Sequence, residues 1–231
     1  LPLLSLIRKK KINVYGFDTN RSKIESIKKN ISYISDIKNK DLLILDKKKI
    51  FDSSGLKNIS NLDILIICLP TPLNKNNSPD MSYIKTCFNQ IFNYLRINQT
   101  LILESTVYPG ATKDIFFKKL NKKFKLGKNF FIGYSPERIN PGIKGKIKYS
   151  DTTKVVSGYS SNCTKIVKNF YRSIFKKVHT TKSIEIAELS KLYENVYRSV
   201  NIGLVNQIKM ITDKMRINIH DVINASSTKQ F

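Results

Sequence analysis

The 231-residue sequence contains no tryptophan, only two histidines and three cysteines, and only 17 acidic residues against 41 lysines and arginines. Three cysteines cannot form the disulfide framework of a small secreted protein, so we expect a cytoplasmic protein with structural thiols at Cys68, Cys87 and Cys163. No apolar run approaches the ~20 residues of a membrane-spanning helix, so we expect no membrane partner. With 41% hydrophobic and 25% charged residues, the composition also excludes disorder and fibrous repeats.

The shortage of acidic residues leaves a formal net charge of +24, which raises the question of a polyanionic partner. Only seven of the 41 basic residues are arginines, and the lysines are spread over nearly every segment. Nucleic-acid-binding domains tend to use arginine and to gather their charge on one face. We therefore expect no nucleic-acid partner and favour a compositional bias, and a basic nucleic-acid-binding module stays as an alternative. In either case the charge attracts anionic small molecules.

From residue 11 to residue 181 the apolar pattern alternates between strand and helix periods. Strands are predicted at 11–18, 62–70, 100–107, 129–136, 154–158 and 177–181. Helices are predicted at 20–30, 80–95, 111–123 and 163–175, after an apolar, helix-like run at 1–10. Apolar strands that alternate with helices predict an α/β fold with a doubly wound, Rossmann-like parallel sheet, which we assign to residues 1–182.

After residue 182 the pattern becomes one long helical stretch over 183–216, with an apolar residue at every third or fourth position. A helix of ~34 residues is about 51 Å long, which is more than a crossover between neighbouring strands needs. We therefore predict that residues 183–231 open an all-α domain, with a second short helix at 220–227. Lys191 and Asn195 are four residues apart and share one helical face. A solvent-exposed polar stripe that also contains Glu188, Arg198 and Asn206 is the favoured interpretation.

Chemically distinctive residues follow the predicted strands, at the edge where a doubly wound sheet binds its ligands. Asp18 ends the first strand and suits the ribose hydroxyls of a dinucleotide, but a turn-forming aspartate explains it equally well. The stretch from Leu69 to Leu73 holds two prolines, which suit either a ligand or a rigid strand exit. Ser105 and Thr106 end the next strand and are able to hold a reacting hydroxyl or an ordered water.

Glu137 and Arg138 end the following strand, where they either face a ligand or form a surface ion pair. Five segments then occur in a specific order: CLPTPL, LESTVYPGAT, GYSPERINPG, IAELSKLYENVYRSVNIGLVNQIK and ASSTKQF. Together they resemble the UDP-glucose/GDP-mannose dehydrogenase family over essentially the whole chain, and most of all its bacterial branch acting on UDP-N-acetylhexosamines. The resemblance implies two successive NAD-dependent oxidations of carbon 6, from alcohol to carboxylate, for surface polysaccharide synthesis. It also implies an all-α dimerisation domain and a homodimer whose interface is the helical segment from Leu189 to Ile211.

The resemblance implies a role for individual residues of this chain. In the cofactor site, Asp18 and Lys23 hold the adenosine ribose, and Ser105 and Thr106 lie at the nicotinamide. The cofactor is also lined by Leu69, Pro70, Thr71, Pro72 and Leu73. The implied catalytic residues are Thr106, Glu137, Lys191 and Asn195, with Thr106 orienting a water or hydroxyl, Glu137 as base and Lys191 stabilising an oxyanion. The sugar nucleotide also contacts Arg138, Ile139, Asn140 and Pro141, and no metal is implied.

Two family features have no counterpart in these 231 residues: a GxGxxG motif and a glycine-rich segment that ends in the nucleophilic cysteine. We expect the first to precede Leu1 and the second to follow Phe231, and we expect this polypeptide alone to lack turnover. UDP-N-acetylglucosamine is the expected substrate, with UDP-N-acetylmannosamine and UDP-glucose as alternatives. A 3-hydroxyacid or 6-phosphogluconate type of dehydrogenase and an inactive remnant remain as the other interpretations.

Overall fold

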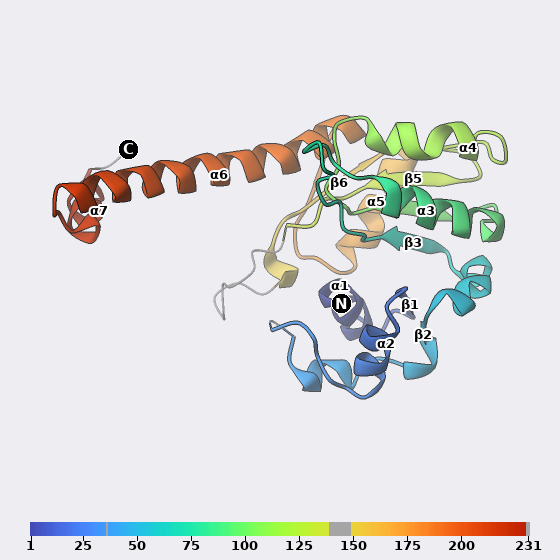
Figure 1. The fold of residues 1–231 in the computed structure, drawn as a ribbon. Coiled ribbons are helices and arrows are strands. Elements are labelled where there is room, and N and C mark those ends of the chain that lie inside the picture. Colours follow the sequence, from blue (N-terminus) through green and yellow to red (C-terminus); the bar gives the residue numbers. More distant parts are fainter. Residues whose placement is uncertain (36, 139–148, 230–231) are drawn as a thin grey trace. The chain divides into compact units, whose positions relative to one another are not determined.

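The computed structural model describes residues 1–35, 37–138 and 149–229, and its centre is a five-stranded sheet (Figure 1). The strands lie in the order β3 (Ile64–Ile67), β4 (Thr100–Leu103), β5 (Phe131–Tyr134), β6 (Lys154–Gly158) and β7 (Val178–Thr180). All four residues of β4 and all five residues of β6 are buried. The predicted α/β architecture is confirmed. Helices cover both faces of the sheet, which agrees with the near-continuous apolar runs of β3 and β4.

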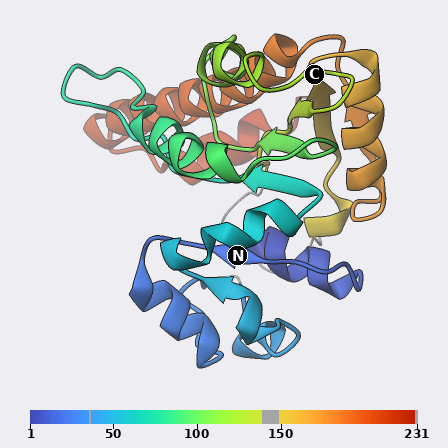
Figure 2. The same cartoon turned by 90° about the vertical axis from the view of Figure 1, so that its right-hand side faces the viewer.

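Helices cover the two faces of this sheet in separate apolar clusters (Figure 2). On one face lie α3 (Ser82–Ile91) and a helical stretch that contains the π-helical turn Lys113–Phe117 followed by α4 (Lys118–Leu120). On the other face lie α1 (Pro2–Lys9) and α5 (Ser161–Arg172). The α5 helix approaches the sheet closely at Gly158, where an added Cβ would lie 2.3 Å from the backbone nitrogen of Thr164. Only glycine permits that contact.

The sheet differs from the prediction in the direction of two strands, β6 and β7. Strands β3, β4 and β5 are mutually parallel and β6 is parallel to β7, but β6 is antiparallel to β5. The expectation of an all-parallel sheet is therefore wrong at this junction. An apolar run has the same period in either direction, so the sequence pattern carries no signal of this reversal.

The N-terminal strand is also much shorter than predicted. Instead of residues 11–18, β1 contains Gly16–Phe17 and pairs only with the two-residue β2 (Ile50–Phe51), in a separate small sheet. The ladder cannot extend because β2 is enclosed by 3₁₀ turns. α2 (Arg21–Lys28) packs here in a small apolar cluster of its own and is capped by Asn20, whose side chain accepts from the Lys23 N–H. The 3₁₀ helices are η1 (Asn39–Leu42), η2 (Lys47–Lys49), η3 (Ser53–Asn61), η4 (Phe92–Tyr94) and η6 (Tyr149–Asp151).

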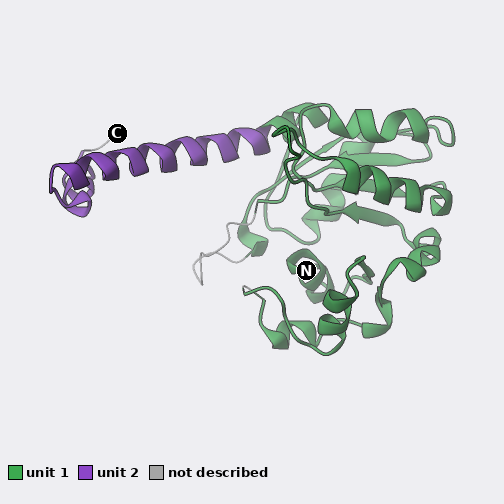
Figure 3. Ribbon diagram, viewed as in Figure 1, with its two compact units in different colours: residues 1–189 green, residues 190–231 purple. Residues whose placement is uncertain are grey.

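The chain divides into two compact units, residues 1–189 and residues 190–231 (Figure 3). The long helix is confirmed as α6 (Ile184–Lys214), and α7 (Ile219–Ser226) follows it in the second unit. Asn218 caps α7, because its side chain accepts from the His220 N–H at 3.0 Å. Among the described residues, no helix combines the length and the apolar character needed to cross a membrane.

Candidate functional site

The carboxyl ends of β3 and β4 are joined by side-chain hydrogen bonds. The Leu69 N–H donates to Ser105 Oγ at 3.0 Å, and Thr71 Oγ1 donates to the Thr106 carbonyl at 2.7 Å. Ser105 is buried and Thr106 is half-buried. The predicted cofactor segment and the predicted hydroxyl pair therefore lie against each other, as adjacent parallel strands require. In the same segment Leu73 is exposed, and the Pro72 carbonyl accepts from the Asp80 N–H.

The ends of β4 and β5 are joined in the same way. The Ser135 N–H donates to the Leu103 carbonyl at 3.0 Å, and the Tyr134 hydroxyl donates to the Ser105 carbonyl at 3.2 Å. Ser135 Oγ in turn donates to the Val155 carbonyl of β6 at 2.8 Å. Three strand ends and the start of a fourth strand thus form one hydrogen-bonded edge.

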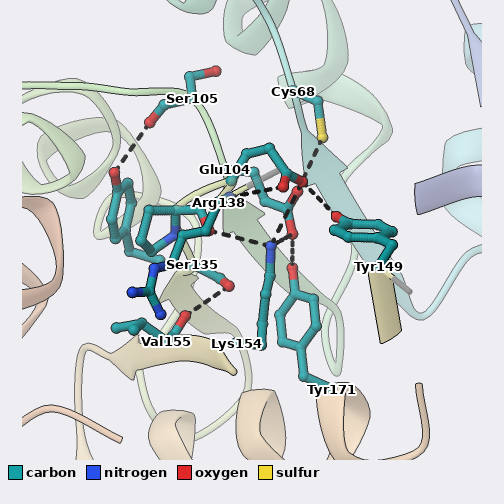
Figure 4. Close-up of polar contacts among 12 residues, drawn as sticks. Cys68, Glu104, Ser105, Ser135, Arg138, Tyr149, Lys154, Val155 and Tyr171 are labelled. Atoms are coloured by element: carbon teal, nitrogen blue, oxygen red, sulfur yellow. Dashed lines mark hydrogen bonds and ion pairs between the residues drawn. The ribbon is translucent and has the colours of Figure 1, made fainter. Parts of the chain in front are cut away.

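A buried ion pair lies beneath this edge (Figure 4). Lys154 Nζ lies 2.8 Å from Glu104 Oε1, and both side chains are almost completely excluded from solvent. The same carboxylate accepts from the Tyr171 hydroxyl at 2.5 Å and lies 3.6 Å from Cys68 Sγ. Lys154 Nζ also donates to the Pro136 carbonyl at 3.3 Å. Such pairing and hydrogen bonding offset the free energy lost when both charges leave water.

Glu137 lies at the border of this cluster. Its Oε2 accepts from the Tyr149 hydroxyl at 2.5 Å and lies 3.9 Å from Lys154 Nζ, while its Oε1 accepts from the Arg138 N–H at 2.7 Å. Arg138 Nη1 donates to the Thr153 carbonyl at 2.9 Å. The expected substrate contacts at Ile139, Asn140 and Pro141 lie outside the described residues.

Burial keeps the hydroxyl and thiol donors of this cluster in their neutral forms. The pKa of Tyr149 and that of Tyr171 are both raised, first by burial and then by the nearby Glu104 carboxylate. The pKa of the Cys68 thiol is raised as well, first by desolvation and then by the Glu104 carboxylate, although the Cys68 residue as a whole is exposed. These groups therefore donate hydrogen bonds to the carboxylates, and Cys68 has little thiolate character.

Asp18 and Lys23 lie together at the end of β1. Asp18 Oδ1 accepts from the Asn20 N–H at 2.9 Å, which is the turn-forming contact, and Asp18 Oδ2 lies 4.0 Å from Lys23 Nζ. An acid and a cation at the end of β1 fit the ribose part of a dinucleotide.

Glu188 contradicts the interpretation of a solvent-exposed polar stripe on the long helix. Its carboxylate is fully buried and accepts from the Gly110 N–H at 2.6 Å, the Thr112 N–H at 2.9 Å and Thr112 Oγ1 at 2.6 Å. Gly110 has a φ of +94°, which favours glycine at this turn. Glu188 thus caps the helical stretch that begins beside Thr112. Burial raises its pKa, although the three donors favour the charged form.

Lys191 and Asn195 belong to the second unit, where both are half-buried, and Arg198 and Asn206 are exposed. The sequence motifs gave no role to Glu104, Lys154, Tyr149 or Tyr171. The one available signal was a lysine directly before the two valines of a predicted strand, which is an unusual place for a charge. Among the described residues, no group of three or more histidines, cysteines or acidic residues is arranged to hold a metal ion.

Comparisons with known proteins agree with this architecture. Residues 1–175 match the NAD binding domain of the UDP-glucose/GDP-mannose dehydrogenase family, and residues 185–231 match its central domain. The chain is 39% identical to Protein CapL from Staphylococcus aureus and 33% identical to UDP-N-acetyl-D-glucosamine 6-dehydrogenase from Pseudomonas aeruginosa, each over 223 residues. These alignments cover 95% of this chain but 51% and 52% of the relatives. The chain therefore spans about half the length of the curated relatives it matches.

The fold is also similar to that of enzymes whose structures have been solved. UDP-D-ManNAc dehydrogenase from Pyrococcus horikoshii superposes with a TM-score of 0.88 at 25% identity, over 98% of this chain and 55% of the other. The resemblance to the UDP-glucose/GDP-mannose dehydrogenase family is thus confirmed. NAD as the cofactor is confirmed by the matched domain.

Proposed function

The chain belongs to the UDP-glucose/GDP-mannose dehydrogenase family, and we propose that it forms the cofactor-binding part of an NAD-dependent 6-dehydrogenase acting on a UDP-N-acetylhexosamine. UDP-N-acetylglucosamine is proposed first, because a relative that is 33% identical carries the name UDP-N-acetyl-D-glucosamine 6-dehydrogenase. UDP-N-acetylmannosamine is the principal alternative, since a relative of that name is 32% identical. UDP-glucose is the other alternative. The product is a uronate for surface polysaccharide synthesis.

The observation that carries this proposal is the hydrogen-bonded edge formed by the ends of β3, β4 and β5. It supports a cofactor site in which Asp18 and Lys23 hold the adenosine ribose and the segment from Leu69 to Leu73 lies along the dinucleotide. Ser105 and Thr106 lie at the nicotinamide end in this proposal. Residues 1–182 are then the NAD-binding domain, and residues 183–231 begin the central domain.

NAD, when bound, accepts hydride from carbon 6 of the substrate. Thr106 orients the reacting hydroxyl or a water, and Glu137 takes the proton on a carboxylate that Tyr149 holds in place. Lys191 and Asn195 stabilise the negative charge that develops on the substrate oxygen, a contribution of about 3 kcal/mol. Arg138, Ile139, Asn140 and Pro141 contact the sugar nucleotide.

The family's covalent step needs a reactive cysteine, and the three cysteines of this chain do not provide it. Cys163 is fully buried, Cys87 packs against the core, and the raised pKa of Cys68 disfavours its thiolate. We therefore propose that residues 1–231 alone release no NADH from a UDP-sugar. NADH release by the isolated chain would contradict this part of the proposal.

We further propose a cytoplasmic homodimer, formed through the apolar stripe of α6 between Leu189 and Ile211. Tyr193, Val196, Val200 and Leu204 follow one another at helical spacing, and all four are exposed in the chain by itself. Sedimentation velocity of the chain is expected to show a dimer that Val200→Asp converts to a monomer. The matched control is Asn206→Asp, which adds the same charge at an exposed polar position of α6. Equal dissociation by both variants would contradict a dimer through this stripe.

A chimera tests the catalytic proposal. Residues 1–231 replace the matching half of the Pseudomonas aeruginosa 6-dehydrogenase, which supplies the remaining segments. The chimera is expected to release two NADH for each UDP-N-acetylglucosamine, and less for UDP-N-acetylmannosamine or UDP-glucose. Lys191→Met is expected to lower kcat by about 10²- to 10³-fold, because the substrate oxyanion loses its cation.

The control for the chimera is Lys209→Met. Lys209 is exposed and forms an ion pair with Asp213, one turn further along the same helix. The kcat of this variant is expected to stay within twofold of the unsubstituted chimera. A chimera that folds and binds NAD but oxidises none of the three sugars would overturn the proposed activity. An unchanged kcat in Lys191→Met would overturn the role of that lysine.

A further inference from the structure

We infer that Lys154 is a positioning residue that holds the end of β5, and with it Glu137, against the end of β4, which continues into Ser105 and Thr106. The inference concerns a buried ammonium group that the family motifs do not include. Its catalytic meaning rests on the proposed role of Glu137, whereas its structural content can be tested separately.

The reversal of β6 explains how a residue in that strand reaches the site. In the β5–β6 register, Gly133 is opposite Gly158 and Tyr134 is opposite Ser157. Continued by three residues, this register sets Glu137 opposite Lys154. A parallel strand would present its last residue at this edge, but the antiparallel β6 presents its first.

Three contacts of one Nζ atom join two strand ends. Lys154 Nζ lies 2.8 Å from Glu104 Oε1 at the end of β4, donates to the Pro136 carbonyl at 3.3 Å, and lies 3.9 Å from Glu137 Oε2. Pro136 directly precedes Glu137, and Glu104 directly precedes Ser105. The lysine therefore fixes both the backbone before the proposed base and the side chain of the base itself.

The surroundings of the lysine leave it few other arrangements. Its Nζ lies 5.1 Å from the Tyr171 ring centre and 5.6 Å from that of Phe175, so the cation is enclosed by aromatic rings on the α5 side. Tyr171 also binds the Glu104 carboxylate, which fixes the partner of the lysine from the same side. A buried ion pair stabilises folding weakly, and its better-supported use is to specify one arrangement.

Residue-resolved amide hydrogen exchange of the chain tests this inference. The informative amides are Arg138, which donates to Glu137 Oε1, and Leu69, which donates to Ser105 Oγ. The reference amides are Phe131 and Tyr159, which donate to the Gln99 and Ile132 carbonyls within the sheet. Lys154→Met keeps the length of the side chain and removes the charge. We expect exchange at Arg138 and Leu69 to rise at least tenfold, with the reference amides changed less than threefold.

Two further variants separate positioning from stability. Glu104→Gln/Lys154→Met removes both charges, so no unpaired ion is buried, and it carries the test if Lys154→Met alone does not fold. Its informative amides are still expected to exchange at least tenfold faster, whereas Lys154→Arg is expected to keep the slow exchange of the original chain. Equal acceleration at all four amides, or slow exchange at Arg138 and Leu69 in the folded double variant, would overturn the inference.

The chimera adds a functional measurement. The double variant is expected to lower kcat by more than tenfold while the KM for NAD stays within threefold, and Lys154→Arg is expected to recover most of the loss. An unchanged kcat in the double variant would overturn the link to Glu137. An inactive unsubstituted chimera would count against the proposed function, and the exchange result would still decide the positioning role.

Discussion

The two units of the chain use charge and apolar surface in opposite ways. In residues 1–189, Glu104, Lys154 and Glu188 are only 3%, 2% and 0% exposed. In residues 190–231, Tyr193, Val196 and Val200 are 71%, 60% and 64% exposed. Buried charge lowers stability unless it is paired, and exposed apolar surface marks a contact with something else. The first unit therefore pairs its buried charges internally, whereas the second exposes an apolar stripe in the chain by itself.

The two units also differ in how far the structure explains the placement of their side chains. In the first unit, each buried charge has named partners within the unit, so its position is determined by the fold. In the second unit, the apolar stripe of α6 is defined by its spacing alone, and its role depends on what covers it. Substitutions matched between the two units test this contrast directly.

The largest expected effect is the loss of a core aromatic ring from the first unit. Phe116 is fully buried and meets Phe88 edge-to-face at 4.8 Å between ring centres. Phe116→Ala is expected to lower the free energy of unfolding by roughly 3–5 kcal/mol, measured by urea denaturation, because it opens a cavity. Val196→Ala in the monomeric Val200→Asp background is expected to change it by less than about 0.5 kcal/mol. A comparable loss of unfolding free energy in Phe116→Ala and Val196→Ala would contradict the difference between the two units.

A smaller effect is expected at Glu188, and it depends on pH. Glu188→Gln leaves one buried N–H without a good acceptor and is expected to cost about 1–2 kcal/mol at pH 7. Because the folded-state pKa of Glu188 is raised, proton uptake stabilises the native chain at low pH, and this contribution is lost as the pH rises from about 4.5 through the folded value. Urea unfolding from pH 4.5 to 7 is expected to show this decline in the original chain but not in Glu188→Gln.

The neighbouring Glu185 is the matched control for that experiment. Its ion pair with Lys113 lowers its pKa, so its contribution is present at neutral pH and is lost as the pH falls through the lowered value. Glu185→Gln is therefore expected to change the pH dependence with the opposite sign. The same sign for both variants would contradict the assigned burial of Glu188.

The smallest effect is expected from two helix caps, one in each unit. Ser160 accepts from the Cys163 N–H at the start of α5, and Asn218 accepts from the His220 N–H at the start of α7. Ser160→Ala is expected to cost about 1 kcal/mol in urea unfolding of the first unit. Asn218→Ala is expected to leave that transition unchanged and to raise amide exchange in α7 alone. A shift of the first transition by Asn218→Ala would show that the two units unfold together.

The sequence predicted those helices and strands whose apolar residues recur with a regular period. Strands β3 to β7 and helices α2, α3, α5 and α6 were predicted because apolar residues recur at two distinct spacings. The reversed direction of β6 and β7 was not predicted, and neither were the buried partners Glu104 and Lys154. Helical spacing does not distinguish Glu188 from the other polar residues of the long helix, so Glu188 was assigned to a solvent-exposed stripe. The candidate residues Ser105, Thr106 and Glu137 were found through motifs at strand ends, and their roles remain predictions.

The Glu188 cap has a consequence for how the chain assembles. Its carboxylate accepts hydrogen bonds from the N–H groups of Thr112 and Gly110, which precede Glu188 in the sequence by 76 and 78 residues. During synthesis those donors leave the ribosome long before their acceptor does. The start of the helical stretch after Gly110 therefore stays incomplete until α6 begins to form, which makes its closure a late, non-local step of folding.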